Sequence, residues 1–271
     1  MENPKIYYNS ESIQDNYDIV IPRIDVPYTD FGFKVLRQFQ ALGIYTTDTA
    51  YSLELARNKL RSLQYMMRHN VPFPTTGFSY AMGGYKKLMK TIGGDSFVIK
   101  LNEGTQGMGV FLAEDRKQAK NFLGTFDQFD TEVMAQEFIA ESAGTDLRCF
   151  VVGDKVVASM RREAQDEDFR ANVSLGGHAF SADLSEEERE LALKASKAVT
   201  MNISGVDIIR SDRGPLVIEI NSAPDFGGEW GLESVSGVDV ADAIVAYAEE
   251  GKARYDRGEG IWLDDPGPYK G

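Results

Sequence analysis

The sequence has few of the side chains that carry nucleophilic and zinc chemistry. It contains one cysteine and two histidines in 271 residues. One cysteine excludes an internal disulfide, which favours a cytoplasmic protein. Cys149 itself lies in the β-rich run LRCFVV and reads as a small buried hydrophobic residue. Two histidines argue against a histidine-based triad or a zinc site.

Long apolar runs and basic charge are also scarce. No uninterrupted apolar run is long enough to cross a membrane, and the first residues, MENPKIYYNSES, lack the basic and apolar regions of a signal peptide. The formal net charge is −13, which argues against bulk binding of DNA or RNA because that binding needs a cationic surface. We therefore expect neither nucleic acid nor a membrane as partner. A local cluster of cations can still bind ATP inside an acidic protein.

Hydrophobic periodicity predicts helices mixed with local strand pairs. Residues 52–70 carry apolar side chains at helical spacing and predict one long helix. Residues 238–251 predict a last helix that stops at Gly251. Residues 146–162 and 205–224 each predict a hairpin. Because the strand pairs are local, the fold class that we expect is α+β rather than a long parallel sheet.

A glycine-rich loop interrupts residues 97–115, FVIKLNEGTQGMGVFLAED. A P-loop or a dinucleotide-binding turn would open a helix after its glycines, whereas an apolar strand-like run follows here. The loop can instead fold over phosphates as a flap, with backbone N–H groups and the Thr105 hydroxyl as donors. Lys100, just before the loop, would place a point charge on a phosphate. An ordinary hairpin with a flexible turn is the alternative.

Two carboxylates and an amide meet in the second hairpin. A turn centred on Arg213 sets Asp207 opposite Glu219, and Asn221 shares a strand face with Glu219. Like charges directly opposite one another destabilise a hairpin unless a cation lies between them. An oxygen-only ligand set suits Mg²⁺ or Mn²⁺ bridging nucleotide phosphates. A solvated acidic hairpin with a register shifted by one residue is the alternative.

The flap and the downstream D…E-x-N pattern together resemble the ATP-grasp superfamily. The closer resemblance is to RimK, the ligase family that adds glutamate to the C-terminus of a small-subunit ribosomal protein. It covers roughly residues 18–221 and is carried, in order, by RNKLRSLQ, VIKLNEGTQGMGV, GTDLRCFVVGDKVVA, DFRANVSLGG and GVDIIRSDRGPLVIEIN. It implies an ATP-grasp fold, in which two α+β subdomains clamp ATP.

The resemblance implies a role for each matching residue. The implied ATP-binding residues are two lysines, the flap, the edge that meets the adenine, a further nucleotide contact and a closing segment: Lys59, Lys100, Gly104, Thr105, Gln106, Gly107, Gly109, Glu137, Phe138, Asp146, Arg170, Ala171 and Asn172. The implied ligands of two Mg²⁺ or Mn²⁺ ions are Asp207, Glu219 and Asn221. A surface position is the alternative for Lys59.

The resemblance also implies a reaction. ATP phosphorylates a carboxylate to an acylphosphate, an amine attacks, and ADP and phosphate leave. The expected substrates are an acidic amino acid and a carboxylate-bearing acceptor, either a protein C-terminus or a small molecule, and a homo-oligomer is expected. Four arginines can hold acidic groups because the guanidinium fork matches a carboxylate: Arg148, Arg161, Arg162 and Arg170. A surface salt bridge is the alternative for each.

Three features depart from the family pattern. Few residues precede the central part, so residues 1–50 are expected to form a reduced N-terminal segment, before subdomains 51–133 and 134–271. Ser174 and Leu175 stand where the family tends to be basic. The loop at 222–236 is longer than usual. These departures leave open a small-molecule amino acid ligase or a non-catalytic ATP-binding module.

Overall fold

The computed structural model describes residues 5–79, 85–101, 109–127, 132–165, 169–171, 176–229 and 231–259, without the side chains of 14, 85, 86, 126 and 127. Several predictions on binding residues therefore lie outside the described chain: Gly104, Thr105, Gln106, Gly107 and Asn172.

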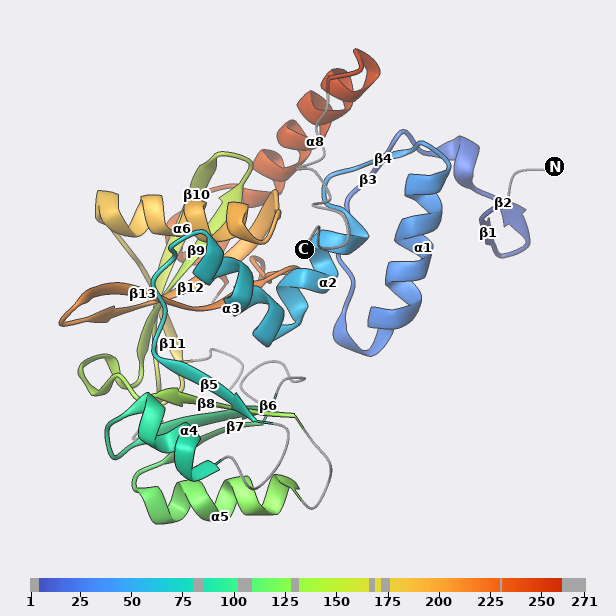
Figure 1. Cartoon of the computed structure of the whole chain (residues 1–271). Coiled ribbons are helices and arrows are strands. Elements are labelled where there is room, and N and C mark those ends of the chain that lie inside the picture. Colours follow the sequence, from blue (N-terminus) through green and yellow to red (C-terminus); the bar gives the residue numbers. More distant parts are fainter. Residues whose placement is uncertain are drawn as a thin grey trace.

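Two antiparallel sheets form the body of the molecule (Figure 1). The larger has the strand order β11-β10-β9-β12-β13, with β9 Thr145–Val152, β10 Lys155–Glu163, β11 His178–Ser181, β12 Ile203–Ser211 and β13 Gly214–Asn221. The smaller has the order β5-β8-β6-β7, with β5 Thr76–Ser79, β6 Phe97–Leu101, β7 Val110–Ala113 and β8 Val133–Glu137. Both predicted hairpins are present, as β9-β10 and β12-β13.

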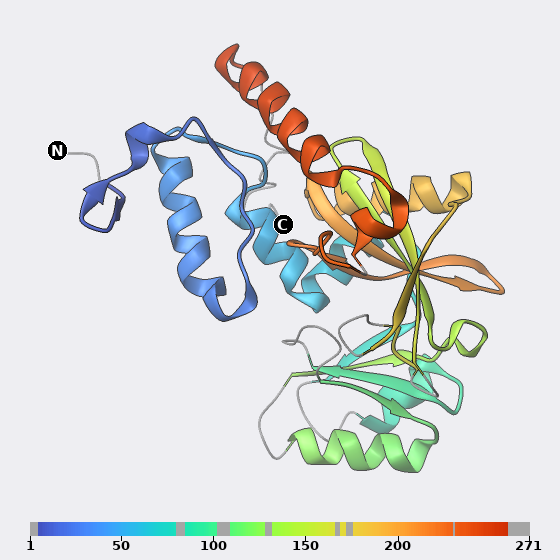
Figure 2. The same ribbon diagram turned by 180° about the vertical axis from the view of Figure 1, so that it is seen from behind.

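Helices pack on both faces of the large sheet and on one face of the small sheet. They are α1 Thr29–Ala41, α2 Ala50–Arg57, α3 Lys59–Arg68, α4 Tyr85–Ile92, α5 Arg116–Asp127, α6 Glu186–Ala198, α7 Leu232–Ser236 and α8 Val240–Asp256. Short elements complete the described chain: β1 Tyr7–Tyr8, β2 Glu11–Ser12, η1 Gln14–Asn16, β3 Ile19–Val20, η2 Val26–Tyr28, β4 Tyr45–Thr46 and η4 Ala140–Ser142. In Figures 1 and 2, α4 and α5 lie on the side of the small sheet that faces away from the large one. This mixture of local strand pairs and helices confirms the α+β prediction.

Three apolar cores hold the elements together. The first packs α1, α2, α3 and α6 against one face of the large sheet, where Leu53 and Val206 are fully buried. The second joins α4 and α5 to the small sheet around Phe97. The third covers the other face of the large sheet with α7 and α8, around Phe150 and Leu232. Cys149 is buried in the first core, as predicted.

The predicted central subdomain, residues 51–133, does not match one packed unit. Its first helices, α2 and α3, belong to the core of the large sheet. At its other end, β8 is an inner strand of the small sheet and pairs with both β5 and β6. A boundary between residues 133 and 134 therefore cuts β8, because the strand pairs with β5 and β6 along its length as far as Glu137.

The single helix predicted over residues 52–70 is wrong. The chain forms α2 and α3 instead, with Asn58 between them in an extended conformation. The Asn58 side chain accepts a hydrogen bond from the backbone N–H of Arg61 and so caps α3. Helical periodicity continues across the break, which is why the pattern alone did not reveal it. The break makes Lys59 the first residue of α3.

The stop predicted at Gly251 is also wrong, because α8 continues to Asp256. A Cβ atom at Gly251 would lie 2.0 Å from the hydroxyl of Tyr45. The glycine is therefore needed for close packing of α8 against β4 rather than for ending the helix. Among the described residues, no helix has the length and apolar character needed to span a membrane.

Candidate active site

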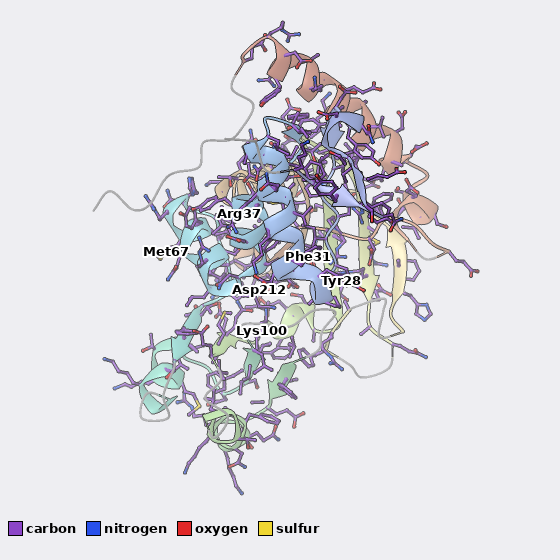
Figure 3. The ribbon with its side chains drawn as sticks, turned by 90° about the vertical axis from the view of Figure 1, so that its right-hand side faces the viewer. Tyr28, Phe31, Arg37, Met67, Lys100 and Asp212 are labelled. Carbon is purple, nitrogen blue, oxygen red and sulfur yellow. The ribbon has the colours of Figure 1, made fainter. Side chains whose placement is uncertain are left out.

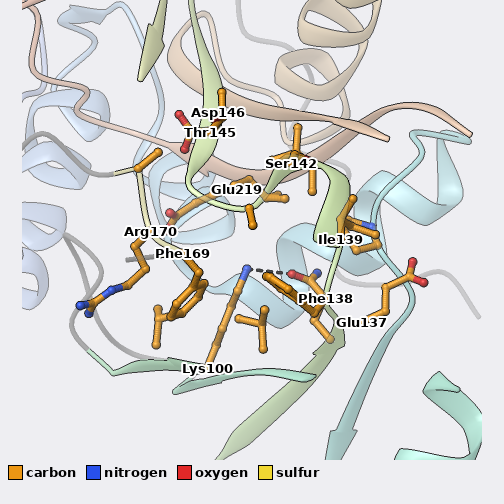
Figure 4. Close-up of a pocket in the computed structure, with 18 of the residues that line it drawn as sticks. Lys100, Glu137, Phe138, Ile139, Ser142, Thr145, Asp146, Phe169, Arg170 and Glu219 are labelled. Carbon is orange, nitrogen blue, oxygen red and sulfur yellow. Dashed lines mark hydrogen bonds between the residues drawn. The ribbon is translucent and has the colours of Figure 1, made fainter. Parts of the chain in front are cut away.

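A pocket opens between the two sheets and collects most of those predicted binding residues that the structure describes (Figure 4). Its walls come from β6, β7 and β8, from the segment after β8, from residues 169–171 and from β12 and β13. The residues predicted from the sequence that line it are Lys59, Lys100, Glu137, Phe138, Asp146, Arg170, Ala171 and Glu219. Residues about 160 positions apart in the sequence are thereby brought to one place.

Two lysines make one side of the pocket cationic. Lys100, on β6, donates a 2.8 Å hydrogen bond to the side-chain oxygen of Gln136 on β8. The pKa of Lys100 is lowered to about 8: burial is the main cause, the charge of Glu219 opposes the shift, and the charge of Lys59 adds to it. Lys59 Nζ lies 3.9 Å from a Glu219 carboxylate oxygen, and the Lys59 side chain is 15% exposed. The alternative surface position for Lys59 does not hold.

The carboxylate hairpin has the register that the sequence predicted. Asp207 on β12 lies directly opposite Glu219 on β13. Asp207 is fully surrounded: Arg148 donates to its two oxygens at 2.8 and 2.7 Å, and the amide of Asn221 donates to Oδ2 at 3.2 Å. Arg162 lies 2.9 Å from the same Oδ2. The cations that neutralise Asp207 in this structure are thus side chains of the protein.

These contacts keep Asp207 ionised. Burial alone raises the pKa of Asp207, but the charges of Arg148 and Arg162 and their hydrogen bonds outweigh burial and lower the pKa to about 2. Like-charge repulsion in the hairpin is therefore relieved without a metal ion, and it cannot by itself argue for one.

The oxygen donors nonetheless fit a hard cation. Among the described residues, no three His, Cys, Asp or Glu side chains gather in one place, so a metal ion here would depend on two carboxylates and an amide. Asn221 turns its amide nitrogen toward Asp207, which leaves its carbonyl oxygen for another partner. The Glu219 side chain is 39% exposed and lines the pocket. This set matches the ligand preference of Mg²⁺ and Mn²⁺.

Arginines on β10 alternate between the two faces of the large sheet. Arg162 points to the face that carries Asp207, and it donates to both oxygens of Asp146 at 2.6 Å. Arg161 points to the opposite face, where it pairs with Glu163 at 2.9 Å and stacks over the ring of Phe180. Successive side chains on a strand face opposite ways. Of these two candidate arginines, the structure therefore places Arg162 beside the site and Arg161 away from it.

Three other predicted residues, Glu137, Arg170 and Gly109, lie in different surroundings. Glu137 lines the pocket, but its carboxylate accepts hydrogen bonds from Arg213 and from the backbone N–H of Thr75. In Figure 4 the Arg170 guanidinium points away from Lys100. At the end of the flap, Gly109 has a φ of +74°, a conformation that favours glycine.

Sequence reasoning did not single out several residues that line the pocket, among them Gln136 and Phe169. Gln136 joins Lys100 to β5, because its amide nitrogen donates to Thr76 Oγ1 at 2.8 Å. Phe169 lines the pocket and packs edge-on to Phe138, with ring centroids 6.3 Å apart. The alternation of β8 could have indicated Gln136, since it is a polar residue that directly follows the apolar run VMA. No comparable signal marks Phe169.

Comparisons with known proteins found two family models that match this chain. A family model described as a RimK-like ATP-grasp domain matches residues 56–248, and one described as a RimK PreATP-grasp domain matches residues 1–53. A probable alpha-L-glutamate ligase from Cellvibrio japonicus is 46% identical over 248 residues, which are 92% of this chain and 81% of that relative. One of the same name from Pseudoalteromonas translucida is 44% identical over 262 residues, covering 96% and 86%.

Solved structures share the fold at lower identity. The D-alanine–D-alanine ligase of Bacillus anthracis in complex with ATP has a TM-score of 0.68 and 21% identity, covering 91% of this chain and 82% of that one. A RimK-domain ATP-grasp protein from Sphaerobacter thermophilus has a TM-score of 0.64 and 18% identity, covering 86% and 81%. At these identities the likeness shows the ATP-grasp fold alone.

Proposed function

The chain belongs to the RimK-like ATP-grasp family of ligases, and on that premise we propose that it adds glutamate or another acidic amino acid to the C-terminal carboxylate of a protein or peptide. The activity at the coarser level, an ADP-forming ligation of an acid to an amino acid, follows from the family itself. The observation that carries the proposal that ATP activates a carboxylate here is the cationic pocket of Lys59 and Lys100 next to the arginine-held Asp207. Relatives named as glutamate ligases support glutamate as the amino acid added.

The proposed reaction passes through an acylphosphate. The acceptor carboxylate attacks the terminal phosphate of ATP, and the bond from that phosphate to ADP breaks. The amine of the amino acid then attacks the acyl carbon, an amide bond forms, and phosphate leaves with one oxygen from the acceptor. No nucleophilic side chain is required, so the protein acts by positioning and by charge neutralisation.

The residues of the pocket suit these tasks. Lys59 and Lys100 place two positive charges where triphosphate oxygens would lie. Asp207, Glu219 and Asn221 are the oxygen donors that would hold Mg²⁺ or Mn²⁺, and two such ions would neutralise phosphate charge. Arg148 is the arginine nearest to these donors, with its side chain 13% exposed. In this proposal it would hold the acceptor carboxylate and neutralise charge on the acylphosphate.

Product analysis tests the proposal directly. The protein is incubated with ATP, Mg²⁺ and each amino acid, with peptides that end in a free carboxylate, the same peptides amidated at the C-terminus, or small carboxylic acids. We expect phosphate release and a mass increase of one or more glutamates on the free peptides only. Products from small acids alone would identify a small-molecule ligase. ATP binding without any turnover would favour a non-catalytic module.

Two further measurements examine the mechanism. With an oxygen-18-labelled acceptor carboxylate, an acylphosphate requires that label appears in the released phosphate. Asp207→Asn should abolish turnover, whereas Asp212→Asn, at the exposed tip of the same hairpin, should not. A wild-type rate for Asp207→Asn would contradict the proposed metal-ligand role.

Sedimentation of the intact protein tests the predicted homo-oligomer.

A further inference from the structure

The segment that follows the proposed metal ligands folds back over the face of the sheet that carries Asp207. A Cβ atom at Gly205 would lie 2.7 Å from the Cβ of Pro224, so Pro224 sits directly on the sheet at that position. Gly205 and Asp207 are two residues apart on β12 and share a face. Phe226 packs edge-on to Phe150 on the neighbouring strand, with ring centroids 5.7 Å apart.

Three positions on β12 follow one another from the nucleotide pocket to the covered end of the sheet. Ile209 lines the nucleotide pocket, Asp207 lies in the middle, and Gly205 is covered by Pro224. Phosphates that reach Asp207 from the pocket would meet the second substrate on the far side. The segment Ser222–Phe226 therefore forms the wall on the side of the ligand that is joined, opposite the nucleotide.

Arg57 ties this wall to the start of α1. Its Nε donates to Ser222 Oγ at 3.2 Å, and its two terminal nitrogens donate to Thr29 Oγ1 and to the backbone carbonyl of Ile24. Tyr28, which directly precedes α1 and lies at the surface, is labelled in Figure 3. One guanidinium thus joins three acceptors through three separate nitrogens, whereas a lysine presents its donors from a single point.

Arg23 makes a second link to the same wall. It donates to the backbone carbonyl of Pro224 at 2.8 Å, and its guanidinium lies 4.8 Å from the ring centroid of Phe226. Its ion pair with Asp225 is long, at 3.9 Å, and Asp225 is 89% exposed, so that pair adds little. The backbone hydrogen bond and the ring contact are what hold the wall.

We propose that Arg23 and Arg57 form a clamp that positions the wall Ser222–Phe226 for the amino acid and acceptor, while leaving nucleotide binding to the pocket. Both arginines are positioning residues: their bonds end on protein groups, and neither lines the nucleotide pocket. Arg57 also immediately precedes Asn58 and Lys59, so one short stretch anchors the wall and presents a pocket lysine. The proposal rests on the proposed function for the identity of the substrates.

Steady-state kinetics on three variants test the clamp. Arg57→Lys and Arg23→Ala should lower kcat/KM for the amino acid about ten- to hundredfold, the range expected from a misplacement of about 1 Å, while KM for ATP changes less than about twofold. Arg37→Ala is the matched control: it removes a 2.5 Å ion pair between α1 and α2, to Glu54, without touching the wall. It should leave both parameters near wild type. Equal loss for ATP and amino acid, or no loss in either, would overturn the proposal.

Hydrogen exchange judges the clamp independently of turnover. In Arg57→Lys and Arg23→Ala, a peptide covering residues 221–229 should exchange faster than in wild type, and in Arg37→Ala it should not. Unchanged exchange in both clamp variants would refute the clamp even if the kinetics change. If the wild type ligates no substrate, the proposed function fails while the exchange data still decide whether the clamp exists.

Discussion

Replacing Arg162 by Met should destabilise the protein more than any neighbouring surface substitution. The Arg162 guanidinium is 4% exposed and holds two carboxylates that are themselves buried, Asp146 at 8% and Asp207 at 3%. Methionine is an unbranched apolar side chain, shorter than arginine, and it removes the charge. Two buried carboxylates would then share Arg148 alone.

The size of the expected loss in stability follows from the burial of both Arg162 and its carboxylate partners. Removing one partner of a buried ion pair costs about 3–5 kcal/mol, because an uncompensated charge remains in a low-dielectric environment. Arg161→Met is the matched control on the same strand, since Arg161 is 43% exposed and its partner Glu163 39%. An exposed pair of this kind contributes about 0–1 kcal/mol. Adjacent residues should therefore differ by roughly 3 kcal/mol.

Lowering the pH should reduce the difference in unfolding free energy between wild type and Arg162→Met. In the wild type the pKa of Asp207 is about 2, below its ordinary 3.8, so its contribution to stability is present above about pH 4 and lost as the pH falls toward 2. In Arg162→Met the buried carboxylates lose a cation, and protonation relieves them. The gap between variant and wild type should shrink between about pH 7 and pH 4.

Urea unfolding followed by circular dichroism measures both effects, with the slope of the transition checked for two-state behaviour. The reasoning fails if Arg162→Met and Arg161→Met unfold within about 1 kcal/mol of each other. It also fails if the loss in Arg162→Met grows in acid.

Three other predictions concern groups outside that cluster. Because the pKa of Lys100 is about 8, the affinity for ATP in the presence of Mg²⁺, measured by calorimetry, should fall as the pH rises through about 8, whereas Lys100→Met should bind weakly and without that dependence. Burial raises the pKa of Asp48 from 3.8 to about 7 against hydrogen bonds from backbone N–H groups, so its contribution to stability is greatest below about pH 4 and is lost as the pH rises to about 7; Asp48→Asn should lack this trend in melting experiments. Gly251→Ala should destabilise by about 1–3 kcal/mol despite the higher helix propensity of alanine, and Tyr45→Phe, which removes the oxygen 2.0 Å from the new Cβ, should restore part of the loss; a neutral or stabilising Gly251→Ala would contradict the close packing.

Local sequence patterns predicted much of the candidate site. The register of the carboxylate hairpin depends only on the position of its turn, so Asp207 could be paired with Glu219 from the sequence. The lysine before the flap and the segment after β8 were placed by their motifs, and both line the pocket. Where sequence reasoning failed, the cause was orientation or packing. Arg161 and Arg162 are chemically identical neighbours, and only the pairing of β10 with β9 shows which one faces Asp207.

The sequence by itself determined the α+β class, the two hairpins, the oxygen-only donor set and the family, because these depend on residue types at short, regular spacings. The tertiary structure alone decided what surrounds those residues. It showed that arginines already neutralise Asp207, that Asn58 breaks a helix to present Lys59, and that Gly251 makes room for Tyr45. It also brought Arg23 and Arg57 to the wall after Asn221, more than 160 residues away along the chain. Such contacts depend on how separate elements pack, and no local spacing in the sequence records them.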